Sequence, residues 1–170
     1  AKALELVELT GTEFALFRAD WFAAYATIPP AYHAFEGNPL VLADFQKLAG
    51  VDEKALGKLR GVRLRGAVLF SEVASRNRIL ELDPSPFNYG RGYLATSYDH
   101  LSSIKVNDLL ANVLSRDKDA SELIWLTPSG FQGYGIVDKN DKRLDQADSR
   151  VATDNRTKLR DKTVYNGRNC

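Results

Sequence analysis

The sequence predicts an α+β fold in which N-terminal helices pack on a mostly antiparallel sheet of hairpins and a meander. Helix-start signals and apolar spacings of three and four residues fall between residues 10 and 59, whereas residues 62–147 carry short apolar runs separated by turn-forming residues. Helices followed by hairpins are typical of the α+β class. Long crossover helices between the strands are missing, which disfavours a parallel Rossmann-like or barrel fold.

Composition limits the size of the fold and its partners. The 170 residues suffice for one buried core, so we expect a single domain over residues 1–151, followed by an extended arm or linker over the polar, aperiodic residues 152–170. The net charge of +1, from 23 basic and 22 acidic residues, gives no electrostatic footprint for nucleic acid. No apolar run approaches the roughly 20 residues that cross a bilayer, so we expect no membrane insertion.

The start of the chain suggests processing, and the cysteine at its end limits disulfide and metal chemistry. The sequence begins at Ala1 and contains no methionine, so we expect a processed or excised product, which a removed secretory signal would explain. The single cysteine, Cys170, is the last residue printed, which leaves no internal disulfide and no cysteine cluster for a metal.

Three helices are expected before the first strand. The segment Leu4–Leu9 fits either a strand or a helical lead-in. Thr10–Glu13 has the pattern of a capping box and predicts a helix that ends at Pro29. Its buried stripe would be Phe14, Phe17, Trp21 and Tyr25. Asn38 is the expected N-cap of a second helix, Pro39–Ala49, which would bury Leu40, Val41, Phe45 and Leu48, and a third helix spans Asp52–Leu59 before Gly61.

Strands are expected in the rest of the chain. Residues 62–73 and 78–82 read as a hairpin around Ala74–Asn77, and Gly92–Tyr98 reads as a strand after a proline-punctuated loop. Val106–Leu114 would form a short amphipathic helix. The runs Leu123–Thr127 and Phe131–Val137 flank a turn, and Lys142–Asp145 would add a third strand, giving a three-stranded meander.

Glycines leave one face of the middle strand of the meander bare. Alternation places Phe131, Gly133, Gly135 and Val137 on one face. Glycine in a strand often marks the close approach of another group. That group is either an internal aromatic ring such as Trp125 or a flat ligand from outside. We expect both Trp125 and Phe131 to be largely buried.

Few residues suggest catalytic chemistry. The sequence has no phosphate-binding glycine loop, nucleophile elbow or zinc-protease motif. Asp138–Arg143 begins like a calcium loop but has arginine where glycine must turn, so we interpret it as a hairpin turn. His33 and His100 are the two histidines, and Asp99 with His100 is the candidate catalytic pair. Glu72, Arg76 and Arg78 are interpreted as solvated charges.

Six segments, in order, resemble one protein family. They are Arg18–Phe22, Pro29–His33, Ser75–Arg78, Ser97–Asp99, Leu126–Tyr134 and Asn166–Cys170. Their order and spacing resemble the region immediately upstream of the Cys-x-x-Cys-His haem-attachment motif in secreted bacterial c-type cytochrome-like proteins. The resemblance covers about Thr10 to Cys170.

The resemblance implies a role beside a haem. Cys170 would form one haem thioether, and a longer native protein would supply the second cysteine and the histidine of haem c. The chain would then be a periplasmic or secreted accessory domain that packs beside or docks a haem for electron transfer, and the haem would lie against Gly133 and Gly135. Its partner would be a redox protein or an adjoining cytochrome domain. The alternatives are a secreted enzyme with a cleft at Asp99 and His100, or a binding module without a redox group.

Overall fold

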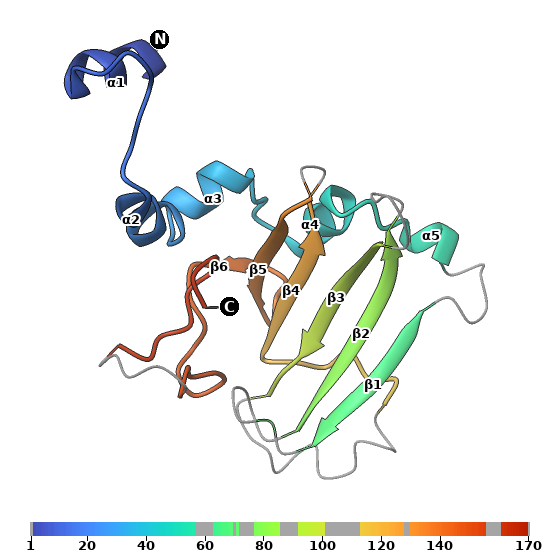
Figure 1. Ribbon diagram of the computed structural model, residues 1–170. Coiled ribbons are helices and arrows are strands. Elements are labelled where there is room, and N and C mark those ends of the chain that lie inside the picture. Colours follow the sequence, from blue (N-terminus) through green and yellow to red (C-terminus); the bar gives the residue numbers. More distant parts are fainter. Residues whose placement is uncertain are drawn as a thin grey trace.

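The chain forms one six-stranded antiparallel sheet in a computed structural model that describes residues 2–56, 63–69, 71, 77–85, 92–100, 113–127, 130–155 and 161–169. The strands pair in sequence order, so the sheet is a continuous meander (Figure 1). They are β1 (Leu64–Leu69), β2 (Asn77–Ser85), β3 (Gly92–Tyr98), β4 (Ala120–Leu126), β5 (Gln132–Asp138) and β6 (Arg143–Leu144). The predicted α+β class is confirmed.

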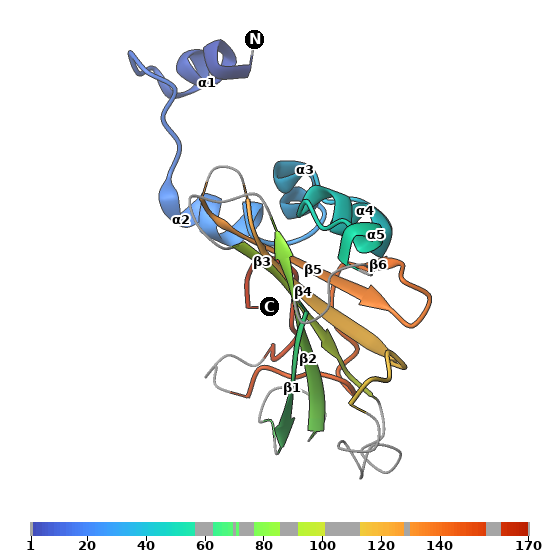
Figure 2. The same cartoon turned by 90° about the vertical axis from the view of Figure 1, so that its right-hand side faces the viewer.

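Short helices precede the sheet. They are α1 (Lys2–Thr10), α2 (Ala19–Trp21), the π-helix η1 (Phe22–Ala26), α3 (Ala31–Glu36), α4 (Leu42–Leu48) and α5 (Glu53–Leu56). Figure 2 shows α3, α4 and α5 beside the sheet, whereas α1 stands away from it. We call the sheet face that packs against α4 the helix face, and the opposite one the C-terminal face.

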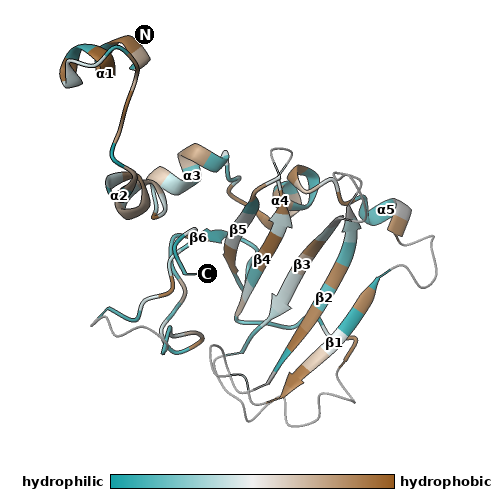
Figure 3. Ribbon diagram, viewed as in Figure 1, coloured by the Kyte–Doolittle hydropathy of each residue, from teal (hydrophilic) through white to brown (hydrophobic). Residues whose placement is uncertain are grey.

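The expected N-terminal helix forms only in its second half, as α2 and η1, and its predicted start is wrong. Thr10 ends α1 instead of capping the next helix: its hydroxyl donates back to the Leu6 carbonyl at 2.7 Å, and Gly11 turns the chain with φ +62°. Phe14, Phe17, Trp21 and Tyr25, the predicted buried stripe, are all exposed. Figure 3 shows brown, hydrophobic stretches on this outlying N-terminal segment. These four residues do have the spacing of a helix stripe, but no part of the described chain covers them.

The second helix begins later than expected. Its N-cap is Val41, because the strand-like stretch before it pairs with the β6 edge through a Val41–Lys142 bridge. Leu40 and Val41 are therefore exposed, whereas Phe45 is fully buried as predicted. Asn38 is buried and donates its side-chain amide to the Tyr134 carbonyl at 3.1 Å. The helix α3 was not foreseen.

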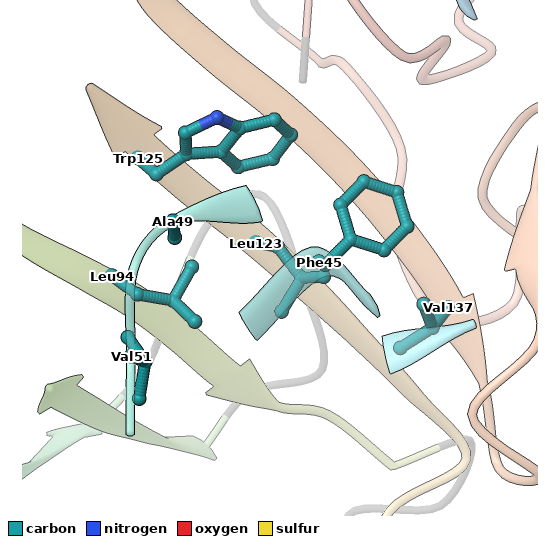
Figure 4. Close-up of a cluster of buried hydrophobic side chains, with 7 residues drawn as sticks. All are labelled: Phe45, Ala49, Val51, Leu94, Leu123, Trp125 and Val137. Carbon is teal, nitrogen blue, oxygen red and sulfur yellow. The ribbon is translucent and has the colours of Figure 1, made fainter. Parts of the chain in front are cut away.

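The main core lies between α4 and the helix face. Its members are Phe45, Ala49, Val51, Leu94, Leu123, Trp125 and Val137 (Figure 4). The bare face of β5 is filled from within: a Cβ on Gly133 would lie 2.5 Å from Trp125 Cε2, and one on Gly135 would lie 2.9 Å from Phe45 Cε1. The internal-aromatic interpretation is confirmed, and a haem against these glycines is excluded by the same two rings.

The strand predictions are largely confirmed. β1 pairs with β2, the strand Gly92–Tyr98 has the predicted limits, and the meander of β4, β5 and β6 forms as expected. Phe131 is an exception at 73% exposed. It precedes β5 and lies in the turn, where its carbonyl accepts the Thr127 amide at 2.8 Å. The predicted turn at 74–77 and the helix Val106–Leu114 fall mainly outside the described residues.

The last segment packs on the C-terminal face. Residues 152–155 and 161–165 have little regular structure and residues 166–169 form a turn, and the segment is not solvated throughout. The Ala147 amide donates to the Val164 carbonyl at 2.9 Å, and Ile136, Ala147 and Val164 form a small buried cluster. The predicted boundary at residue 151 stays a prediction.

Candidate functional site

A buried carboxylate, Glu81, organises the first charge cluster. It is 2% exposed, and Arg65 Nε donates to it from the opposite position on β1. Arg116 Nη2 and the Tyr98 hydroxyl both donate to Glu81 Oε1, at 3.1 Å and 3.0 Å. Burial and the charge of Glu81 raise the pKa of Tyr98 to about 12. Tyr98 is therefore a neutral hydrogen-bond donor near neutral pH.

The same cluster continues along β2 to Asp83. Asp83 pairs across the strands with Leu94, which places it on the helix face. Arg63 bonds Asp83 and also donates to Glu53 Oε1 at 2.9 Å. Burial raises the pKa of the Asp83 carboxyl, although Arg63 opposes this shift. Burial alone would lower the pKa of Arg63, but the Asp83 and Glu53 carboxylates raise it above its ordinary value.

A second charge cluster lies on the C-terminal face. Arg78 Nε is 2.9 Å from Asp99 Oδ1, and Arg78 Nη2 donates to Glu122 Oε2 at 3.2 Å. The Ser97 hydroxyl also donates to Asp99, and its oxygen accepts the Glu122 amide at 2.9 Å. Burial raises the pKa of Asp99 against the opposing charge of Arg78. The solvated interpretation of Arg78 is therefore wrong, whereas Glu72 and Arg76 lie outside the described residues.

The two residues of the candidate pair, Asp99 and His100, contact different charged partners. The Asp99 carboxylate is bound by Arg78 and Ser97, and His100 Nδ1 lies 4.0 Å from Asp119 Oδ2. Successive side chains on an extended strand point to opposite faces. The structure thus brings Asp99 together with Arg78, and the alternative of a catalytic role for His100 is not tested.

His33 links α3 to the residue that follows β6, Asp145. Its Nδ1 is 3.2 Å from the Asn38 amide nitrogen, and its Nε2 is 3.2 Å from Asp145 Oδ1. Burial and the nearby Arg143 lower the pKa of His33. A buried, largely neutral imidazole with a group at each ring nitrogen serves as a structural link.

Hollows of different sizes adjoin the two clusters. The cavity on the C-terminal face, next to Arg78, Asp99 and Asn169, measures about 30 Å³, enough for one or two water molecules. On the helix face, a groove of about 390 Å³ is lined by Leu42, Tyr98, Arg116, Lys118 and other residues. The groove has the size of a small-molecule site, but its cations face carboxylates such as Glu53 and Asp141. The described residues contain no group of three or more metal-ligating side chains.

The residues just before Cys170 are fixed to the body. Asn166 is fully buried, and its side-chain amide donates to the Leu144 carbonyl at 2.6 Å. Gly167 has φ +86° and rests on Tyr32, where a Cβ would lie 2.3 Å from the ring. Asn169 Nδ2 donates to Asp154 Oδ2 at 3.1 Å and to the Thr163 carbonyl at 3.0 Å. Cys170 itself lies outside the described residues.

The sequence alone did not point to these anchoring residues. The segment is polar and has no period, so composition suggested an arm. One available signal was Gly167 within Asn166–Asn169, since asparagine and glycine favour tight turns.

Comparison with protein-family models, with curated proteins and with solved structures gave no match for this chain. In the part of the chain that the structure describes, no helix has the length and apolar character needed to cross a bilayer.

Proposed function

We propose that this chain is an extracytoplasmic accessory domain that holds a c-type haem, attached through Cys170, beside its own body for electron transfer. The anchorage of residues 166–169 is the observation that carries this proposal. A free linker before Cys170 would leave an attached group at variable distance from the domain. Buried Asn166 and the Gly167–Tyr32 contact support a fixed attachment point instead.

The chain contributes one of the groups that haem c requires. Cys170 is its single thiol and would form one thioether, while the second cysteine and the axial histidine would come from a longer native chain. When bound, the haem supplies the one-electron chemistry. The chain's own part is to fix the attachment point and to limit the access of water, two of the means by which a protein tunes such a centre.

The position of the haem differs from the one the sequence suggested. Trp125 and Phe45 already fill the space over Gly133 and Gly135, so this face has no room for a macrocycle. The anchored segment instead leaves the body beside Tyr32 of α3 and the small cavity that Asn169 lines. We therefore propose that the haem lies beside α3 and the C-terminal face.

The two charge clusters fit a structural role in this domain. Each buried carboxylate faces at least one arginine, and paired buried charges of this kind fix strands in register. The helix-face groove of about 390 Å³ favours the second candidate, a binding module without a redox group. The presence or absence of covalent haem separates the two.

A loosened anchor should expose the haem. The test uses the longer protein, matured with haem in a bacterial periplasm. There Asn166→Ala should speed reduction of the haem by a soluble reductant, because losing the hydrogen bond to the Leu144 carbonyl frees the segment before Cys170. Asn140→Ala, at an exposed asparagine of the β5–β6 turn, is the matched control and should leave the rate unchanged. Equal rates in both variants would count against the proposed packing of haem and domain.

A further inference from the structure

The N-terminal arm, residues 2–27, has few contacts with the body. Helices α1 and α2 and the π-helix η1 contain no buried residue. Both views show α1 projecting away from the sheet, joined to it through α2 (Figures 1 and 2). The recorded ring contact to the body is Phe22 against Phe35 of α3, at 5.6 Å between centroids.

The arm is rich in exposed apolar side chains. Those more than half exposed are Leu4, Leu9, Phe14, Leu16, Phe17, Trp21 and Tyr25. The Phe17 and Phe22 rings are tilted against each other with centroids 5.5 Å apart, and Phe22 in turn contacts the exposed Phe35 of α3. Exposed apolar side chains gathered in this way, with Phe17, Phe22 and Phe35 in direct contact, mark an interaction site.

Such an arm requires a partner for its stability. Helix α1 has 9 residues, and helices shorter than about 12 to 15 residues are marginal in water unless tertiary packing supports them. The body of the same chain provides no such packing among the described residues. Among the described residues the body meets the arm mainly at Phe22 and Phe35, so we infer that another chain covers the rest of it.

The accessible surface has the size that a stable dimer needs. A compact monomer of 18.9 kDa would expose about 8,300 Å², whereas this chain exposes 11395 Å². The excess is about 3,000 Å² per chain by the same relation. Obligate homodimers bury about 2,000 to 5,000 Å² in total, so half of the excess from each chain is sufficient.

Charge identifies a second copy as a suitable partner. Residues 1–27 carry two basic and four acidic side chains, a net charge of −2, whereas residues 28–170 carry 21 basic and 18 acidic side chains, a net charge of +3. Two arms would repel each other, but an arm and a body attract. A net acidic arm is also poorly suited to an anionic membrane, which attracts basic segments.

We propose that two copies of this chain form a symmetric dimer by exchanging their N-terminal arms. The acidic, aromatic arm of each copy packs on the net basic body of the other, so that the same contact occurs twice about one two-fold axis. Exchange of an identical element is a low-cost route to a closed dimer. This inference is independent of the haem.

Analytical ultracentrifugation of the 170-residue chain tests the dimer. With a reducing agent present, so that Cys170 cannot link two chains, we expect twice the monomer mass of 18.9 kDa at micromolar concentration. Raising the salt from about 0.05 M to about 1 M should weaken the dimer, because it shortens the screening length from above 10 Å to about 3 Å. A folded monomer under both conditions would overturn the proposal.

Polar and apolar variants at Phe17 and Trp21 distinguish loss of the apolar dimer contact from misfolding. The double variant Phe17→Ser with Trp21→Ser should raise the dimer dissociation constant at least about tenfold, since buried aromatic anchors dominate interface energies. Phe17→Leu with Trp21→Phe keeps the surface apolar and should retain the dimer. Circular dichroism checks that both variants fold. A dimer unchanged by the serine variant would show that the arm is not the contact.

Discussion

Gly133→Ala is the most direct test of how the sheet core is built. A methyl group at this position would lie 2.5 Å from Trp125 Cε2, 2.7 Å from Cζ2 and 2.8 Å from Nε1. Carbon atoms in contact normally sit about 3.5 to 4.0 Å apart, so the indole would have to retreat by about 1 Å. Trp125 is buried and already packs edge-on against Phe45, with ring centroids 5.4 Å apart, so it has little room to move.

The expected loss of stability follows from this overpacking. Added methyl groups in a close-packed core cost about 1 to 3 kcal/mol. Gly66→Ala in β1 is the matched control, because a Cβ there would meet nothing within 4 Å. Replacing such a glycine is expected to stabilise the protein by about 0.4 to 1 kcal/mol, through the unfolded state. Urea unfolding of both variants measures the difference.

Shortening Trp125 should reduce the loss of stability caused by Gly133→Ala. In a Trp125→Leu background, Gly133→Ala should be less destabilising, with a coupling energy of about 0.5 to 3 kcal/mol between the two sites. If the two changes are additive, or if Gly133→Ala is as harmless as Gly66→Ala, the indole does not cover Gly133 and the proposed core packing is wrong.

The charge clusters yield two further predictions. Because the pKa of Asp99 is raised in the folded state, the folded protein binds this proton more tightly than the unfolded chain, and the free energy of unfolding should fall as the pH rises above the ordinary value of 3.8. Asp99→Asn should reduce this fall, and an unchanged pH profile of urea unfolding would contradict the assignment. Glu81→Ala should cost about 3 to 5 kcal/mol in the same assay, because it leaves Arg65 and its neighbours uncompensated. Asp148→Ala, which breaks a solvent-exposed pair with Arg150, should cost much less stability, and similar losses for the two would refute burial as the cause.

Local patterns were sufficient to predict the strands. Alternation and turn residues depend on neighbours in sequence, so the Gly92–Tyr98 strand and the meander could be read without knowing the rest of the fold. The N-terminal arm could not be read in this way. Thr10–Gly11 suits the end of a helix as well as the start of one. An apolar stripe also does not say whether its own chain or a partner covers it.

The charge clusters depend on strand register, which the sequence left open. Arg65 meets Glu81 across the β1–β2 pair, at a separation of 16 residues. The alternation Arg63-x-Arg65 and Glu81-x-Asp83 was visible and would have paired once the hairpin was aligned. Arg78 gave no such signal, because its partners come from later parts of the sheet: Asp99 directly follows β3, and Glu122 lies in β4.

Covalent haem in the longer native protein tests the central claim most directly. The protein, matured in a bacterial periplasm, should retain its Soret absorbance after denaturation and give a c-type pyridine haemochrome spectrum, because thioether links survive unfolding. Cys170→Ala should change that spectrum to the single-thioether form or abolish it. A mature protein without covalent haem, or a haem unaffected by Cys170→Ala, would contradict the proposed function.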